Sequence, residues 1–199
     1  MHVFLDFIFS ILIGITIILI VLNANMVIGE GWSLQNAEML VQQMLISSRT
    51  LVEGELGSIG SGVQRDLVTG SGLILYADST RIRFAVDLQM NSSVNVIEYR
   101  FGNASDVDFG NQNIRPLYRS VDDGPEHIVG LMTDFSLSYI CPEGDELMLP
   151  AVHPGNVSAI EIVMEVQYPY ALPDYGDGDI LFGSQSARSR VNIKNLEWR

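Results

Sequence analysis

The feature that most constrains this chain is an apolar run near its N-terminus. From Phe7 to Leu22, the apolar side chains are interrupted only by three small residues. With its flanks, the run covers residues 3–28, which is about 26 residues or roughly 39 Å of helix, whereas a bilayer needs only about 20 residues. A buried core helix of this length and apolarity would need a much larger protein around it. The sequence therefore predicts a transmembrane anchor over residues 1–28.

The distribution of charge bears on how the anchor is used. A cleaved secretory signal normally carries Lys or Arg before its apolar core, but all eleven Lys and Arg lie at or beyond Arg49. This favours an uncleaved, single-pass anchor, and we expect the bulk of the chain outside the cytoplasm, in the periplasm or on the cell surface. The net charge of −13 and the pI of about 4.4 argue against a nucleic-acid partner, because phosphate binding needs a basic patch.

A second helical pattern follows the anchor. Apolar side chains recur close to i, i+3, i+4 and i+7 spacing, which predicts an amphipathic helix. They are Ala37, Leu40, Val41, Met44, Leu45 and Leu51. We expect this helix over residues 29–53, with Ser33 as a candidate N-cap. Two glycines at residues 29–31 suggest a break or hinge, and the simplest arrangement is one long N-terminal helix that is weakened there. Its apolar face is expected to pack on the soluble domain.

Residues 54–199 have the pattern of a β-rich domain. Residues 54–72 are rich in glycine and predict a loop, and a second long loop is expected over residues 169–187. Between and after these loops, short segments rich in β-formers are bounded by turn residues. The predicted strands are residues 73–76, 81–88, 94–101, 116–120, 127–140, 159–168 and 190–198, the second and third forming a hairpin. A long helix followed by strands predicts an α+β fold, with the N-terminal helix packed on one face of a mainly antiparallel sheet.

Several stretches of the soluble part carry a resemblance to a known family. They are LVEGELGSIGSGV (51–63), RIRFAVDL (81–88), VIEYRF (96–101), RPLYRS (115–120), IVGLMTDFSLSYI (128–140), VSAIEIVMEV (157–166) and RVNIKNL (190–196). In this succession the chain resembles the type IV pilin superfamily. It is most similar to the large minor pilins and minor pseudopilins of type IV pilus and type II secretion systems. The resemblance implies a pilin-like fold over most of the chain.

The first residues add to the resemblance. Pilins usually have Phe-Thr-Leu-Ile-Glu at the processed N-terminus, and removal of Met1 would make Asp6 the fifth residue, where the family has its glutamate. The resemblance thus implies that Phe4, Leu5, Asp6 and Phe7 take part in assembly. The residues alone allow two interpretations of Asp6, because a carboxylate inside a membrane costs about 2.5–3.5 kcal/mol. Either it lies in the headgroup region or it pairs with the amino terminus of a neighbouring subunit.

These observations lead to one functional expectation and one alternative. We expect a non-enzymatic, membrane-anchored subunit that assembles through its N-terminal helix, with other pilin-like subunits, into a filament or a secretion pseudopilus. The alternative is a monomeric membrane-anchored module that binds a ligand or partner outside the cytoplasm through residues 169–187.

Other chemistry is weakly represented in the sequence. Asp174, Asp177 and Asp179 supply hard oxygen ligands in a short loop and form a candidate calcium site. No other cofactor is expected. The chain contains no HExxH zinc motif, no GxSxG nucleophile elbow and no phosphate-binding loop, so the sequence favours a protein without enzymatic activity.

Overall fold

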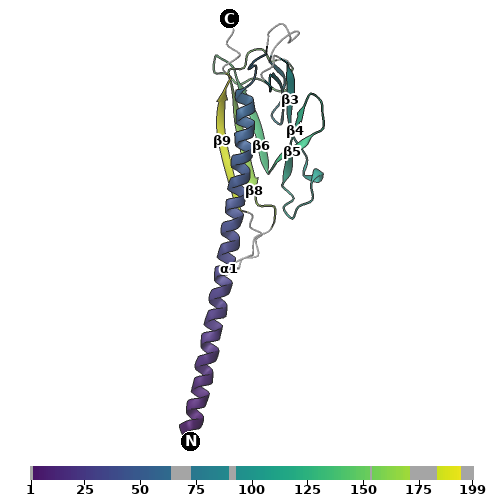
Figure 1. The fold of residues 1–199 in the computed structure, drawn as a ribbon. Coiled ribbons are helices and arrows are strands. Elements are labelled where there is room, and N and C mark those ends of the chain that lie inside the picture. Colours follow the sequence, from purple (N-terminus) through teal and green to yellow (C-terminus); the bar gives the residue numbers. More distant parts are fainter. Residues whose placement is uncertain (1, 64–72, 90–92, 153, 171–182, 194–199) are drawn as a thin grey trace.

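The chain folds as one long helix followed by strands in two antiparallel sheets, as Figure 1 shows for the computed structural model. The structure describes residues 2–63, 73–89, 93–152, 154–170 and 183–193. The N-terminal half of the helix projects away from the strands, and its C-terminal half lies against them. The expected α+β class, with an N-terminal helix and a mainly antiparallel β domain, is confirmed.

Helix α1 (His2–Gly57) is continuous over 56 residues. The expected single long N-terminal helix is confirmed, and Gly29 and Gly31, which suggested a weak point or break, both lie within it. A glycine costs only about 1 kcal/mol relative to alanine in a helix interior, and a helix already formed on both sides propagates through such a position because helix formation is cooperative. Ser33 is consequently an interior helical residue and not an N-cap.

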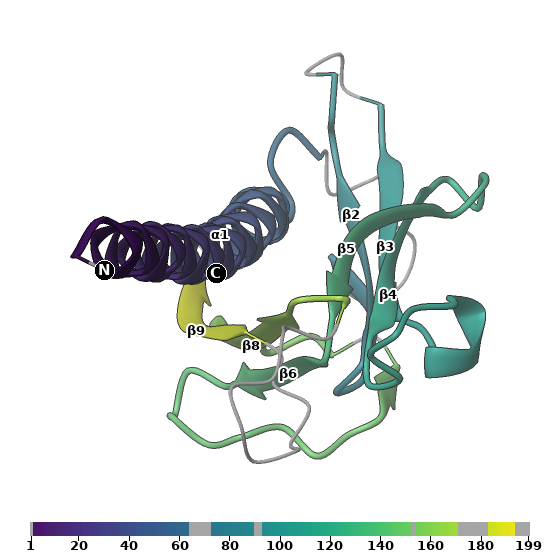
Figure 2. The ribbon, with the colours of Figure 1, turned by 90° about the horizontal axis from the view of Figure 1, so that it is seen from below.

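The C-terminal half of α1 buries one face against the strands. The buried residues follow one another at intervals of four or three positions: Ala37, Val41, Leu45, Ser48, Val52 and Leu56. This confirms the expected amphipathic face in part, since Leu40 and Leu51 are exposed instead. The helix also ends at Gly57, a few residues into the segment expected to be a loop. Figure 2 shows α1 from below, obliquely and foreshortened, with β9 and β8 beside it.

The first sheet contains six antiparallel strands. Their order across the sheet is β5 (His127–Met132), β4 (Arg115–Val121), β3 (Asn95–Phe101), β2 (Arg81–Val86), β1 (Ile74–Ala77) and β7 (Ala151–Val152). Strands β2 and β3 pair as the expected hairpin, with Phe84 opposite Ile97. A short 3-10 helix, η2 (Ala104–Asp106), lies between β3 and β4 in the sequence. The two-residue strand β7 and helix η2 were not expected.

The second sheet contains β6 (Asp134–Ile140), β8 (Ala159–Gln167) and β9 (Ser184–Asn192), in that order. The alternation of Phe135, Leu137 and Tyr139 expected within residues 127–140 is confirmed in β6. These residues form two strands and not one, because the chain leaves the first sheet at Thr133. The Thr133 amide already donates a hydrogen bond of 2.8 Å to Glu165 in β8. Strand β9 also begins earlier than expected, inside the segment predicted as a loop.

The hydrophobic core lies where the helix and the two sheets meet. Val52 and Leu56 of the helix, Phe84 of the first sheet, and Phe135 and Ile162 of the second are almost fully buried in one cluster. The helix therefore packs mainly on the second sheet and also contacts β5 at the edge of the first. This arrangement positions the long apolar segment of α1 relative to the whole β domain.

Candidate functional site

The free N-terminal half of α1 is the first candidate site. Its side chains from Phe4 to Ile28 are almost all exposed, and within the described residues this is the one helix long and apolar enough to cross a membrane. No residue in the most apolar part of this helix is buried inside the protein. A surface of this size has to be covered by lipid or by other protein surfaces.

The residues expected to act in assembly lie together at the tip of this helix. Phe4, Leu5 and Phe7 are exposed, as is Asp6. Ser10 donates a hydrogen bond of 2.8 Å to the backbone carbonyl of Asp6, not to its carboxylate. Within the described part of the chain, the Asp6 carboxylate has no ion-pair partner. Its proposed partner in a neighbouring subunit therefore stays a prediction.

A second apolar surface runs along the outer side of α1, beyond the anchor. Trp32, Met39 and Ile46 are 69%, 59% and 63% exposed, at intervals of seven residues. At roughly 100° per residue, they lie on the side of the helix opposite the buried face that contains Val41 and Ser48. We call these three residues the outer stripe. The sequence was expected to give this helix one buried face only, although the regular spacing of the outer stripe is visible in it.

A polar cluster fastens the end of α1 to the first sheet. Both carboxylate oxygens of Glu55, in the last turn, accept hydrogen bonds from Arg119 of β4, the shortest being 2.6 Å. The buried Tyr99 hydroxyl of β3 also donates to Glu55. Burial and then the bond to Glu55 raise the pKa of Tyr99, so the phenol keeps its proton, and the bond to Glu55 raises the pKa of Arg119. The cluster holds the helix end in place and forms no open site.

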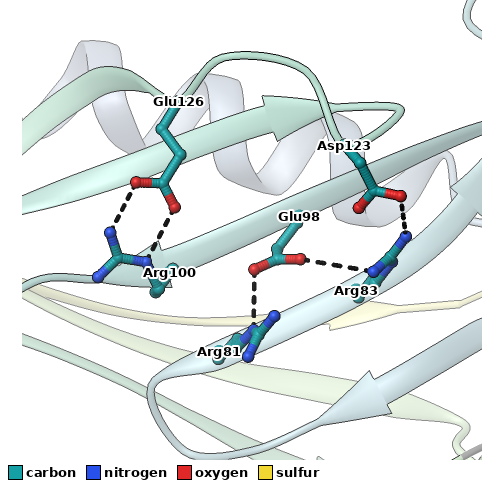
Figure 3. A network of polar contacts seen from close by, with 6 residues as sticks. All are labelled: Arg81, Arg83, Glu98, Arg100, Asp123 and Glu126. Atoms are coloured by element: carbon teal, nitrogen blue, oxygen red, sulfur yellow. Dashed lines mark hydrogen bonds and ion pairs between the residues drawn. The ribbon is translucent and has the colours of Figure 1, made fainter.

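The outer face of the first sheet carries a row of paired charges, drawn in Figure 3. Its members are Arg81, Arg83, Glu98, Arg100, Asp123 and Glu126. Arg81 contacts Glu98 at 2.8 Å, Arg83 contacts Asp123 at 2.7 Å, and Arg100 contacts Glu126 at 2.7 Å. The Arg100 bond lowers the pKa of the Glu126 carboxyl. Because three cations face three anions, this surface has little net charge to attract a charged ligand.

The candidate calcium site cannot be placed. Asp174, Asp177 and Asp179 all lie outside the described residues, so this site stays a prediction. Within the part of the chain that the structure describes, no group of three or more His, Cys, Asp or Glu side chains is arranged to hold a metal ion.

Comparison with known proteins gives no family assignment. Neither the protein-family models, nor the curated proteins, nor the solved structures include a match to this chain. The architecture is a candidate membrane-spanning helix continuous with a β-rich domain, and it is compatible with a membrane-anchored protein of pilin-like design.

Proposed function

We propose that this chain is a non-enzymatic, membrane-anchored subunit that assembles through its N-terminal helix into a filament or a secretion pseudopilus. In this proposal the anchor spans the membrane once, and the acidic β domain lies outside the cytoplasm, in the periplasm or at the cell surface. Other pilin-like subunits are its partners. The proposal combines the resemblance of the sequence to minor pilins and pseudopilins with the shape of helix α1.

The observation that carries the proposal is the continuity of α1. An unbroken helix of 56 residues is about 84 Å long, and its last turn is fastened to the first sheet by Glu55 and Arg119. The position of the anchor therefore fixes the position of the β domain. A monomeric binding module needs only a flexible tether, because its ligand does not sense where the anchor lies. A subunit of a packed assembly does need this rigid connection.

Asp6 provides the chemical test of assembly. A helix that only had to span a bilayer would be more stable in the membrane with an uncharged residue at position 6. The reason is that a carboxylate inside the membrane costs up to about 2.5–3.5 kcal/mol. A positive amino terminus from a neighbouring subunit would offset that cost and set the axial register. If Asp6 lies only at the headgroups, its charge has no role in assembly.

We predict that Asp6→Asn leaves membrane insertion intact and reduces co-assembly. The measurement is co-purification or crosslinking of subunits from membranes, together with electron microscopy of the full-length protein, at matched membrane levels. Asp6→Glu keeps the charge and should retain assembly better than Asp6→Asn. Gln42→Ser, on an exposed part of the helix, should have the smaller effect. Undiminished assembly of Asp6→Asn would contradict the proposed pairing, and monomers alone would favour the anchored binding module.

A further inference from the structure

The free edges of the two sheets differ in how they are protected. An edge strand presents a row of unpaired backbone N–H and C=O groups, to which another chain can add. Strand β7 has only two residues, and in β6 the Leu137 amide already donates a hydrogen bond of 2.8 Å to the Ser79 carbonyl. In β5, the Val129 carbonyl accepts a hydrogen bond from the Ser48 hydroxyl of α1. Within the described residues nothing comparable protects β9, which runs for nine residues in unbroken register with β8 and contains no proline.

The register shows which backbone groups of β9 face outward. At the two ends of the pairing, the Tyr168 amide donates to the Gly183 carbonyl at 2.8 Å, and the Ile193 amide donates to the Ser158 carbonyl at 2.9 Å. In an antiparallel pair, residues bonded to the partner strand alternate with residues whose N–H and C=O point away from it. The odd-numbered residues of β9 therefore bond to β8, and the even-numbered residues direct their backbone groups to the free edge. These are Ser184, Ser186, Arg188, Arg190 and Asn192, all of them exposed. Figure 1 shows no described strand beyond β9.

The free edge of β9 is positively charged, although the whole chain has a net charge of −13. Strand β9 contains two arginines and no carboxylate. Val191, at an odd-numbered position, faces Gly57 of α1, so the exposed side chains of Arg188 and Arg190 project from the opposite face of the strand. Arg188 contacts Glu161 of β8 at 2.7 Å and keeps 73% of its side chain exposed. Arg190 has no ion-pair partner within the described residues.

We propose that the free edge of β9 binds an extended acidic peptide segment of a partner protein, which adds an antiparallel fourth strand to the three-stranded sheet. Backbone hydrogen bonds hold the added strand in place. Carboxylates at alternate positions of the peptide lie directly opposite Arg188 and Arg190, on the same face of the sheet, where opposite charges stabilise a strand pair. This proposal goes beyond the proposed function, because it uses neither Asp6 nor the membrane-spanning segment.

Charge selects an acidic peptide over a second copy of β9. When two β9 strands pair antiparallel over their whole length, Arg188 lies opposite Arg188 of the other copy. Like charges directly opposite one another destabilise a strand pair, and charged side chains on an edge discourage its association with other edges. An acidic peptide converts the same positions into attractive pairs. The two arginines thus disfavour self-pairing and favour a partner with carboxylates.

Binding of synthetic peptides to the full-length protein in detergent tests the proposal. The probe is a fluorescein-labelled peptide of nine residues, the length of β9, in which Glu alternates with Thr and Val. A second peptide has Lys in place of every Glu. Two more keep the sequence and charge of the probe and carry backbone N-methyl groups, either on the Glu residues or on the residues between them. In an antiparallel added strand the Glu amides point toward β9 and the other amides point away. Fluorescence anisotropy measures the affinity.

We expect saturable binding of the Glu peptide, and affinity lower by roughly tenfold or more for the Lys peptide and for the peptide methylated on its Glu residues. Methylation of the residues between them should change the affinity by no more than about twofold. Replacing both arginines, Arg188→Glu with Arg190→Glu, should make the Lys peptide the better ligand. The matched control is Arg115→Glu in the first sheet, since Arg115 is also exposed and has no ion-pair partner within the described residues. This variant should keep the preference for the Glu peptide.

Three results would overturn the proposal. They are failure of the Glu peptide to bind, equal binding of the Glu and Lys peptides, and equal binding of the two methylated peptides, which would show attraction by charge without addition of a strand. A thermal melt checks that each variant is folded. If the variant without both arginines does not fold, the four peptides still decide the question on the unmodified protein. Asp6→Asn should bind the Glu peptide as the unmodified protein does, so loss of assembly in that variant and loss of peptide binding are separate outcomes.

Discussion

At the scale of single residues, the helix approaches the first sheet closely where Ser48 faces Gly130 of β5. Ser48 is a polar residue in the buried face of α1, and its hydroxyl donates a hydrogen bond of 3.1 Å to the Val129 carbonyl. A Cβ at position 130 would lie 2.7 Å from the Ser48 hydroxyl and 2.8 Å from the terminal methyl of the buried Met132. The small serine and the glycine together allow the helix to lie against this edge strand.

We predict that Gly130→Ala lowers the free energy of unfolding by about 1–3 kcal/mol, because the added methyl overpacks this contact. Chemical denaturation monitored by circular dichroism measures the change. Gly54→Ala is the matched control, since a Cβ there meets nothing within 4 Å. It should be neutral or stabilise by up to about 1 kcal/mol through helix propensity alone. Equal effects of the two substitutions would show that the helix does not need the close approach at Gly130.

At the scale of elements, the ionic contact of Glu55 with Arg119 joins two elements that are far apart in the sequence. We predict that Glu55→Gln destabilises the β domain by about 1–3 kcal/mol, because it removes charge-assisted hydrogen bonds and leaves Arg119 partly buried without its anion. Glu53→Gln is the control, since Glu53 is more exposed than Glu55 and contacts Arg49 at i,i+4 and the uncharged Ser189 of β9, so its loss should cost under about 1 kcal/mol. Similar losses for both variants, measured by denaturation, would contradict a special role for Glu55.

Elements with a strong local pattern could be predicted from the sequence. The pairing of 81–88 with 94–101 follows from β-formers and a turn, and β8 follows from its alternation, with Ile160, Ile162 and Met164 buried. The change of sheet at Thr133 was missed because no glycine or proline marks a turn between Met132 and Phe135. One local feature marks the change of sheet. Met132 and Phe135 are both buried although they are three residues apart, and residues at an odd interval would lie on opposite faces of a single continuous strand.

Elements without a strong pattern were missed or misplaced for other physical reasons. Strand β9 begins with polar residues, because as the edge of the second sheet it has few fully buried positions. Its first residues therefore look like a loop. The glycines at positions 29 and 31 suggested a break, but propensity is a weak preference that a long helix overrides. The contact of Glu55 with Arg119 depends on the tertiary fold, and no local pattern indicates it.

At the scale of the whole molecule, the chain divides into a part that lipid or other subunits must cover and a part that buries its own core. The candidate membrane-spanning segment was predictable, because length and apolarity alone define it. The core cluster begins at Val41 and contains no residue of the anchor. The first buried side chain along the helix is Ala37. The β domain should therefore fold without residues 1–28, although it is fastened to them by one continuous helix.

We predict that a chain lacking residues 1–28 is soluble and folded, with a cooperative thermal transition. The reason is that the deletion removes apolar surface exposed to solvent and no core contact. Circular dichroism and gel filtration measure the outcome. The control deletion, residues 1–45, also removes Ala37, Val41 and Leu45 from the buried face of the helix. Each large apolar side chain lost from a core costs about 2–5 kcal/mol, so this shorter chain should aggregate or melt far earlier. If the chain lacking residues 1–28 is itself unfolded, the anchor contributes to the fold and the division of the molecule proposed here is wrong.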